Sequence, residues 1–372
     1  MAIRDRYSLV LAVFVWTASS GTLSAQPSVA RPLSAPKAAA VNQALAVELT
    51  KQRGVGLAVA IIERGKTVYL NGFGFADKEQ KRPVTPETVF NWASNSKPLA
   101  AVAAMQLVEQ GKLDLDADVR KYVPEFPDKG AVITSRLLLC HQSGLPHYSN
   151  GKIIPTIRKY EIENPFLDPV NALDKFNQSP LIFAPGERTE YSSYAYVLLS
   201  AVIQRAGDEP FADQIRNRIA KPLGMSTLQL DTATVQPEWA TGYAMRQGDV
   251  RPVRDESHAW KAGAGGFKSN VADFAKFAEG LLNGRLMNPA IQSRMAERQK
   301  LRSGQLTEWG LGLTVGQDGA ALKVSHNGKQ EETTTRLVLY PATKSGVVVM
   351  SNCGFTDPGA FSTAAFRVLQ SR

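Results

Sequence analysis

The sequence predicts an α+β fold. An antiparallel sheet would be built from strands near both ends of the chain and flanked by helices, with a largely helical region inserted between. Two observations lead to this prediction. Short apolar, β-branched runs typical of strands occur at 56–70 and again between 309 and 351. The intervening stretch, about 113–284, is rich in helical patterns and in proline-containing loops. We therefore expect one sheet completed by both ends of the chain.

The N-terminal part of this domain is expected to contain a helix, a β-hairpin and a second helix. Apolar residues at helical spacing predict the first helix over 38–52. Two apolar runs, 56–62 and 67–70, flank a polar turn and form the pattern of a hairpin. A largely apolar helix follows over about 94–109, and Gly111 is expected to end it.

The C-terminal part is expected to supply the remaining strands and a last helix. Apolar segments separated by turn residues predict strands at 309–315, 322–325, 335–340 and 346–351. A final helix is predicted over about 358–369.

The first 25 residues have the pattern of a secretory signal. Arg4 and Arg6 precede a short apolar run at 9–16, and small residues then lead to a cleavage site after Ala25. A permanent N-terminal anchor is the alternative, although the apolar run is short for a membrane span. The Pro-, Ser- and Ala-rich stretch 26–37 is typical of a linker, so the expected domain is 38–372. A cleaved signal implies a periplasmic or secreted protein.

Composition argues against several classes of function. The 372-residue chain has a formal net charge of +9, but its basic residues are scattered and form no nucleic-acid-binding patch. The four histidines and two cysteines show no metal-ligand spacing, so we expect no metal and no cofactor. Cys140 and Cys353 either pair in an oxidising compartment or remain two buried thiols. The expected partner is a small-molecule or peptide substrate, and no membrane span is expected in the mature chain.

Three short clusters carry the chemistry of the chain. In the first, Ser94 and Lys97 are three residues apart at the start of the apolar helix, so the lysine amine can reach the serine hydroxyl. A buried lysine readily loses its proton and then acts as base for a serine. The second cluster, Tyr191-Ser192-Ser193, places a phenol and a hydroxyl at a loop-to-helix corner. The third, His326-Asn327-Gly328, is expected at the end of a strand, where glycine lets a substrate backbone approach.

Taken in this order, the clusters resemble the signature of the serine β-lactamase and penicillin-binding-protein superfamily: Ser-x-x-Lys, Tyr-x-Asn and Lys/His-x-Gly. The stretches 137–146 (LLLCHQSGLP) and 263–269 (GAGGFKS) resemble it too, and the resemblance covers roughly residues 40–355. The chain is similar to class C β-lactamases, D-alanyl-D-alanine carboxypeptidases and related esterases. Residues 145–148 and 260–263 favour the group that contains the mitochondrial serine β-lactamase-like protein.

The resemblance implies a β-lactamase/transpeptidase-like fold and a serine hydrolase that cleaves amide, peptide or ester bonds through an acyl-enzyme on Ser94. It implies that Lys97 takes the Ser94 proton and that Tyr191 is the second proton-transfer group. His326 would supply a donor near the substrate carboxylate or the tyrosine. The backbone N–H groups of Ser94 and Lys329 would form the oxyanion hole.

The chain departs from the family pattern at two places. Ser193 stands where asparagine is usual, and the segment 329–333 is more charged than its counterpart in the family. Both departures concern substrate recognition and leave the nucleophile and its bases in place. The expected substrate-binding residues are Ser193, Gly328 and Lys329. Efficient β-lactam hydrolysis is therefore less expected than amide or ester cleavage. A β-lactam-hydrolysing β-lactamase and a catalytically silent penicillin-binding or scaffold protein remain the alternatives.

Four further residues are potential members of the site. His141 and His147 are expected to be turn and core residues rather than catalytic groups. Trp260 and Trp309 either line the cleft or belong to the core.

Overall fold

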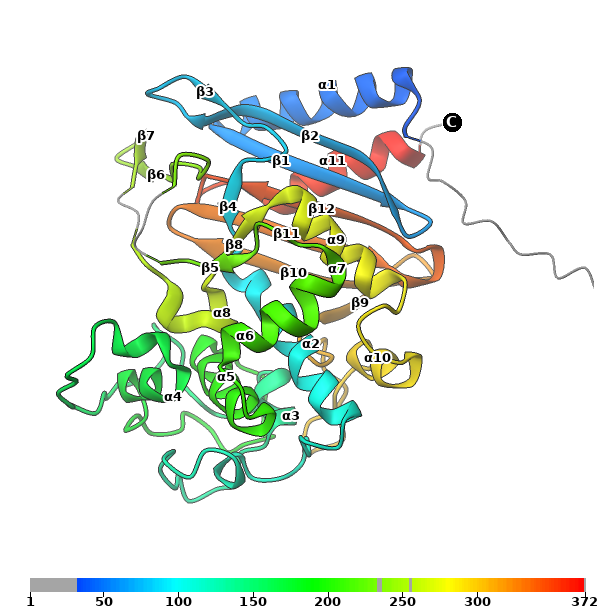
Figure 1. Ribbon diagram of the computed structural model, residues 1–372. Helices are drawn as coiled ribbons and strands as arrows, with labels where there is room; N and C mark the ends of the chain where they lie inside the picture. The colour runs from blue at the N-terminus through cyan, green and yellow to red at the C-terminus, as the bar shows by residue number, and fades with distance from the viewer. Residues whose placement is uncertain (1–31, 233–235, 254–255, 371–372) are drawn as a thin grey trace, which may run out of the picture.

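The structure, a computed structural model, describes residues 32–232, 236–253 and 256–370. Its main sheet has seven strands in the order β3-β2-β1-β12-β11-β10-β9, and every neighbouring pair is antiparallel (Figure 1). The strands are β1 Gly56–Glu63, β2 Lys66–Asp77, β3 Arg82–Pro83, β9 Thr314–Asp318, β10 Ala321–Gln330, β11 Thr333–Tyr340 and β12 Ser345–Ser351. Because β1 pairs with β12, both ends of the chain complete one sheet, and the expected α+β fold is confirmed.

Both faces of this sheet are buried, which explains why β1 is apolar at nearly every position. Leu57, Val59 and Ile61 lie on the face covered by the terminal helices α1 (Ala35–Lys51) and α11 (Pro358–Gln370) (Figure 1). The alternate residues of β1 join the larger core on the opposite face. Successive strand residues point to opposite faces, so a strand that is covered on both sides reads as one continuous apolar run.

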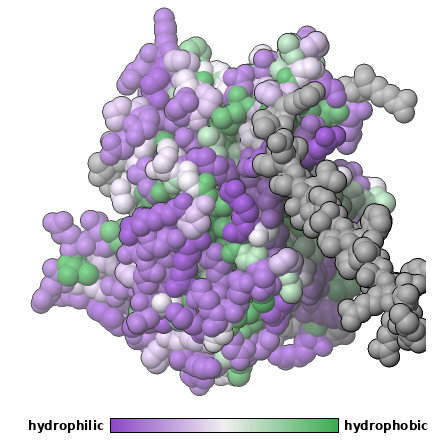
Figure 2. Space-filling view, turned by 45° about the vertical axis from the view of Figure 1, so that its right-hand side comes forward, coloured by the Kyte–Doolittle hydropathy of each residue, from purple (hydrophilic) through white to green (hydrophobic). Residues whose placement is uncertain are grey.

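The opposite face of the sheet packs against α9 (Val271–Leu282) and the helical region around α2 (Ser96–Glu109). Residues 96–107 of α2 are all buried, so this helix lies inside the core rather than on the surface. The remaining helices are α3 Ser135–Leu139, α4 Pro169–Ala172, α5 Ser193–Gly207, α6 Phe211–Ile215, α7 Lys221–Leu223, α8 Ala262–Gly265 and α10 Pro289–Met295. Hydrophilic residues cover most of the face drawn in Figure 2, with hydrophobic residues in small groups between them.

Two small sheets lie beside the main one. One has the order β4-β8-β5 and joins Val89–Asn91, Phe267–Asn270 and Gln229–Leu230. The other is the hairpin of β6 (Tyr243–Arg246) and β7 (Asp249–Pro252). The first sheet matters for the site, because β4 leads directly into Ser94 and β8 follows the glycine-containing segment 263–266.

Several element boundaries differ from the sequence-based expectation. The first helix begins at Ala35 rather than 38, with a proline in its first turn, where proline is well tolerated. The strand expected at 309–315 is wrong for its first five residues, and β9 runs from Thr314 to Asp318. Gly312 has a φ of 86°, and an added Cβ would lie 2.2 Å from the Ala101 Cβ, so this segment is a tight loop against α2. The cluster 326–328 lies within β10 rather than at its end.

The described residues also bear on the remaining expectations. Cys140 and Cys353 are both buried free thiols, so the alternative of a bridge between them does not hold. Among the described residues, no helix is long and apolar enough to span a membrane, and no cluster of His, Cys, Asp or Glu could hold a metal ion. The expected signal at 1–25 and residues 26–31 of the expected linker lie outside the described residues.

Candidate active site

Ser94 lies on a strained turn between β4 and α2. Residues Ala93–Asn95 form a single 3-10 turn, so Ser94 precedes the α-helix instead of starting it as expected. Ala93 has a φ of 45°, which is uncommon for a residue with a Cβ. Its N–H donates to the Asn91 side-chain oxygen at 2.9 Å. A backbone strain of this kind persists only where the surroundings hold it, and here the side chain of Asn91 does so.

Two side chains converge on the Ser94 hydroxyl. The Lys97 Nζ lies 3.2 Å from the Ser94 Oγ, and the Tyr191 hydroxyl lies 2.8 Å from the same oxygen. The Lys97 Nζ is also 3.1 Å from the Ser193 Oγ and 4.8 Å from the centre of the Tyr191 ring. The first two clusters that the sequence singled out therefore meet at one point, although nearly a hundred residues separate them.

The Lys97 amine is fully buried, and the first-turn geometry of α2 turns it toward Ser94. It donates to the Ala264 carbonyl at 2.6 Å, which fixes the amine between α8 and the serine. Burial, followed by the positive charge of Lys261, holds the pKa of the Lys97 amine well below its ordinary value of 10.5. No carboxylate forms an ion pair with Lys97 among the residues that the structure describes. A neutral amine in this position can accept the Ser94 proton.

Tyr191 is held as a neutral phenol by its surroundings. Burial raises the pKa of Tyr191 to about 12, against the opposing effect of hydrogen bonds with Ser94 and Ser193. The ring of His141 packs against it at 4.4 Å between centroids. Tyr191 is therefore placed to donate a hydrogen bond to the Ser94 oxygen and to deliver a proton, while Lys97 is the stronger base of the two in the resting site.

His326 lines the same cleft from β10 and is almost completely buried. Burial chiefly lowers the pKa of His326 to about 3, so the ring is neutral near pH 7. Its Nδ1 lies 2.8 Å from the Asn327 carbonyl oxygen, and in a neutral ring this contact requires that Nδ1 carries the proton. The Nε2 of this tautomer is an acceptor, so the donor role expected of His326 would need the other tautomer.

The three expected substrate-binding residues have different environments. Ser193 lines the cleft, and its hydroxyl lies beside Lys97. Lys329 lines the cleft from β10 and is exposed. An added Cβ on Gly328 would lie 2.6 Å from the Trp92 carbonyl oxygen and 2.1 Å from the Thr335 Oγ1. The glycine therefore leaves room for the turn that carries Ser94, while the approach of a substrate backbone at this position stays a prediction.

A side chain from this turn also reaches β10. With its amide in the orientation that satisfies both ends, Asn95 donates to the His326 carbonyl at 3.1 Å and accepts from the Gly328 N–H at 3.2 Å. The second position of the Ser-x-x-Lys motif thus ties the nucleophile to the strand with the third motif.

The cleft around Ser94 has a volume of about 920 Å³ and contains residues that sequence reasoning missed. His147, expected in the core, lines the cleft and accepts from the Ser193 N–H at 3.2 Å. Trp309 lines it as well, whereas Trp260 packs against the core. The wall and mouth carry further polar and charged side chains: Tyr148, Arg246, Glu256, His258, Lys261, Gln330, Glu331 and Glu332. Gln330, Glu331 and Glu332 belong to the segment 329–333, which the sequence already related to substrate recognition, whereas residues 246–261 match none of the three motifs.

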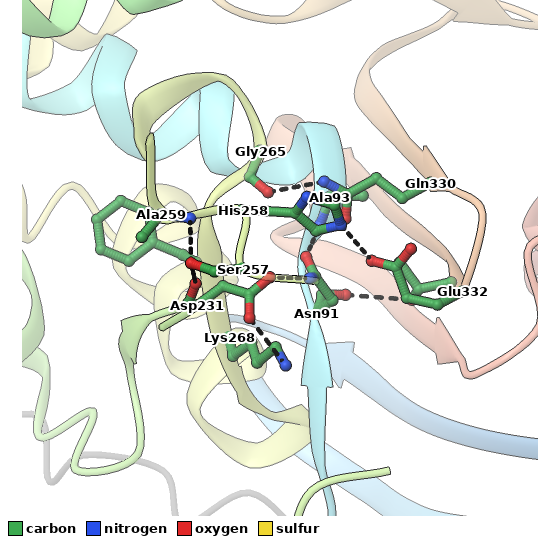
Figure 3. Close-up of polar contacts among 12 residues, drawn as sticks. Asn91, Ala93, Asp231, Ser257, His258, Ala259, Gly265, Lys268, Gln330 and Glu332 are labelled. Atoms are coloured by element: carbon green, nitrogen blue, oxygen red, sulfur yellow. Dashed lines mark hydrogen bonds and ion pairs between the residues drawn. The ribbon is translucent and has the colours of Figure 1, made fainter. Parts of the chain in front are cut away.

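A buried chain of polar contacts supports the Ser94 turn from behind (Figure 3). The Asp231 carboxylate accepts from the Asn91 amide at 2.7 Å and pairs with the Lys268 ammonium at 2.9 Å. Asn91 in turn accepts from the Ala93 N–H. The Asp231 carbonyl accepts from the Ala259 N–H at 3.0 Å, so one residue connects the nucleophile turn, β8 and the cleft wall.

Two more contacts join the cleft wall to the end of β10 and the turn after it (Figure 3). The His258 Nε2 lies 3.1 Å from the Glu332 carboxylate, and the Gln330 amide donates to the Gly265 carbonyl at 2.9 Å. The two walls of the cleft are thus held at a fixed separation on this side of Ser94.

Comparison with known proteins gives a consistent result. The family model Beta-lactamase matches residues 39–371. The mitochondrial serine beta-lactamase-like protein LACTB of Homo sapiens is 32% identical over 295 residues, covering 62% of this chain and 53% of that protein. The esterase EstB of Burkholderia gladioli is 34% identical over 216 residues, covering 55% of this chain and 54% of the esterase. This chain therefore spans about half the length of these two relatives.

A solved structure is similar over more of the chain. The D-amino acid amidase from Ochrobactrum anthropi, solved with L-phenylalanine amide, superposes with a TM-score of 0.74 at 25% identity. The match covers 90% of this chain and 100% of the amidase. The expected β-lactamase/transpeptidase-like fold is thereby confirmed. The family match extends over nearly the whole described domain, and this chain therefore belongs to the beta-lactamase family.

Proposed function

We propose that the protein cleaves ester, amide or peptide bonds through an acyl-enzyme on Ser94. The observation that supports this most strongly is that one hydroxyl lies within hydrogen-bond distance of both an amine with a lowered pKa and a neutral phenol. Serine is a weak nucleophile until a neighbouring base activates it, and Lys97 is such a base. The hydrolase relatives named above support the same reaction class.

The proposed reaction follows from these contacts. The Ser94 Oγ attacks the carbonyl carbon while its proton passes to the Lys97 Nζ. The resulting oxyanion would be held by the N–H groups of Ser94 and Lys329, the largest stabilisation in reactions of this type. As the tetrahedral intermediate collapses, the bond to the leaving group breaks and Tyr191 donates its proton to that group. Tyr191 recovers a proton from the Lys97 ammonium, and a water molecule then hydrolyses the acyl-enzyme by the reverse route.

His326, Ser193 and Lys329 are proposed to contact the substrate. All three line the cleft, and each comes from a motif that the family resemblance assigns to substrate binding. The hydroxyl of Ser193 is shorter than the usual asparagine amide and already accepts from Lys97. The Ser193 hydroxyl therefore has less hydrogen-bonding capacity left for the amide of a substrate. This favours small esters and amides over β-lactams as substrates.

The test is hydrolysis of 4-nitrophenyl acetate, D-phenylalanine amide and nitrocefin by the wild type, Ser94→Ala and Ser96→Ala. Ser96 is the matched control, because its hydroxyl is buried and accepts from the Phe267 N–H instead of reaching the cleft. Ser94→Ala is expected to lose all turnover, and Ser96→Ala to keep most of it. Turnover of nitrocefin in preference to the other two would favour the β-lactamase alternative. Stoichiometric labelling without turnover of any substrate would favour the silent penicillin-binding alternative.

We also propose that the protein is exported to the periplasm or the medium. This proposal rests on the pattern of residues 1–25, with cleavage after Ala25.

A further inference from the structure

His141 is a fully buried histidine beside Tyr191 that the proposed reaction does not involve. It lies where the chain leaves α3: the Gln142 N–H donates to the Leu137 carbonyl at 2.8 Å, and His141 has a φ of 58°. Helices that end in this way usually carry glycine or asparagine at that position, because a Cβ is unfavourable at positive φ. The local backbone therefore does not require a histidine here.

Three contacts join His141 to Tyr191 and its two neighbours in sequence. The Glu190 N–H donates to the His141 carbonyl at 2.9 Å, and the Ser192 N–H donates to the His141 Nδ1 at 3.2 Å. Between these two bonds, the ring centroids of His141 and Tyr191 lie 4.4 Å apart. The backbone is thus held on both sides of Tyr191, and the phenol ring packs against the imidazole.

The imidazole of His141 is itself fixed and neutral. Trp309 packs edge-on against it at 4.4 Å, and Tyr196 lies 5.3 Å from it. Burial, followed by the positive charge of Lys97, holds the pKa of His141 well below its ordinary value of 6.5. Because Nδ1 accepts from a backbone N–H, the neutral ring carries its proton on Nε2, which has no hydrogen-bond partner within the described part of the chain. Only the ring nitrogen that faces the Tyr191 segment is hydrogen-bonded.

We propose that His141 is a positioning residue that holds the Tyr191 hydroxyl against Ser94. This inference rests on the proposed function, in which Tyr191 gives a proton to the leaving group, and adds the residue that makes this transfer efficient. Tyr191 precedes α5, which begins only at Ser193, so the contacts with His141 hold a part of the chain that the helix does not. The Tyr191 hydroxyl lies 2.8 Å from the Ser94 Oγ, and a displacement of about 1 Å at such a distance can slow a reaction about 10²-fold.

The test uses variants that are compatible with the end of α3. His141→Gly places the residue that this backbone prefers and removes both the acceptor and the ring. His141→Asn also tolerates a positive φ, and its side-chain oxygen replaces Nδ1 as the acceptor. His141→Leu fills the space without an acceptor. Each is made in the wild type and in Tyr191→Phe. Phe361→Leu is the matched control for lost core packing, because Phe361 is fully buried on the opposite face of the main sheet.

The substrates are ethyl butyrate and 4-nitrophenyl butyrate, which share one acyl group. Ethoxide must take up a proton as it leaves, whereas 4-nitrophenolate leaves without one. The readout is the ratio of kcat/KM for the ethyl ester to kcat/KM for the nitrophenyl ester, which reports proton transfer to the leaving group. A merely structural loss lowers the amount of folded enzyme and leaves this ratio unchanged.

His141→Gly and His141→Leu are expected to lower the ratio about 10- to 100-fold, because Tyr191 is no longer held in place. His141→Asn is expected to keep most of the ratio, and Phe361→Leu all of it. In the Tyr191→Phe background, the same substitutions of His141 are expected to change the ratio by less than about 2-fold, since the group that His141 positions is absent.

Two results would overturn the positioning role while leaving the Ser94 chemistry intact. One is a ratio that falls equally in both backgrounds, and the other is a wild-type ratio in His141→Gly and His141→Leu. A wild type that releases nitrophenolate but no ethanol would also overturn it, because Tyr191 would then deliver no proton. Turnover of either ester that survives in Ser94→Ala would instead overturn the proposed function. If His141→Gly does not fold, as judged by circular dichroism, His141→Leu gives the same comparison.

Discussion

Asp231 and Lys268 form a buried ion pair near Ser94, and a single substitution that breaks this pair is expected to destabilise the fold strongly. Asp231 is fully buried and Lys268 is 4% exposed, with 2.9 Å between the ammonium and the carboxylate. Asp231→Asn removes the negative charge and leaves the Lys268 charge buried without its carboxylate. Breaking a buried pair from one side typically costs about 3–5 kcal/mol. Asp231→Asn is therefore expected to lower the free energy of unfolding by roughly that amount.

The double variant Asp231→Asn/Lys268→Met is expected to recover most of this loss. It removes both charges together, and replacing a buried pair by neutral groups of similar volume is often neutral or stabilising. The assay is urea unfolding of the single and double variants, followed by the fluorescence of tryptophans such as Trp92 and Trp239, which lie close to the network. Arg251→Met is the control, because it breaks an exposed pair with Asp249, and exposed pairs contribute little.

The outcome that would refute this reasoning is additivity. If the loss of unfolding free energy in the double variant, relative to the wild type, equals the sum of the losses in the two single variants, the two side chains do not act as a pair. A loss below about 1 kcal/mol for Asp231→Asn would also contradict the argument, because a loss that small is typical of a solvent-exposed ion pair.

Three further predictions concern the site and the compartment. The kcat/KM for a neutral ester is expected to rise with pH through the lowered pKa of Lys97 and then stay level, because only the neutral amine accepts the Ser94 proton, and a pH–rate profile that falls over this range would contradict the assignment. His326 and His147 are not expected to contribute an inflection near pH 6.5, since the pKa of His326 is lowered to about 3 and that of His147 to about 4. Tyr191→Phe is expected to slow pre-steady-state acylation by about 10²–10⁴-fold, the usual contribution of a proton-transfer group, while circular dichroism stays unchanged. N-terminal sequencing of protein from the periplasm or medium is expected to begin at Gln26, and a mature product that begins at Met1 would contradict export.

The sequence predicted the parts of this protein that depend on local pattern. The apolar run of β1 and the spacing of Ser94 and Lys97 follow from strand and helix periodicity. The meeting of Ser94 with Tyr191 could be expected only through the family resemblance, because no local rule relates residues so far apart. Gly312 shows the limit of pattern reading: its apolar neighbours suggested a strand, but its positive φ and its contact with Ala101 require a loop.

The residues that periodicity could not reveal are those whose role depends on burial. Asp231 and Lys268 look like ordinary surface charges in the sequence, and only the packing of β4, β8 and the cleft wall encloses them. Lys261 is similar, since its burial depends on the segment 257–266 folding over the cleft. His147 is expected from the sequence to be a turn or core residue, and only the fold places it in the cleft beside Ser193.

Mapping the acylated residue tests the central claim most directly. The wild type is mixed with a slowly deacylating ester or a fluorophosphonate, quenched in acid, digested and analysed by mass spectrometry. A single adduct on Ser94 is expected, absent from Ser94→Ala and strongly reduced in Lys97→Ala, because Lys97 activates the hydroxyl at 3.2 Å. An adduct on Ser96 or Ser193, or equal labelling of wild type and Lys97→Ala, would contradict the assignment of nucleophile and base.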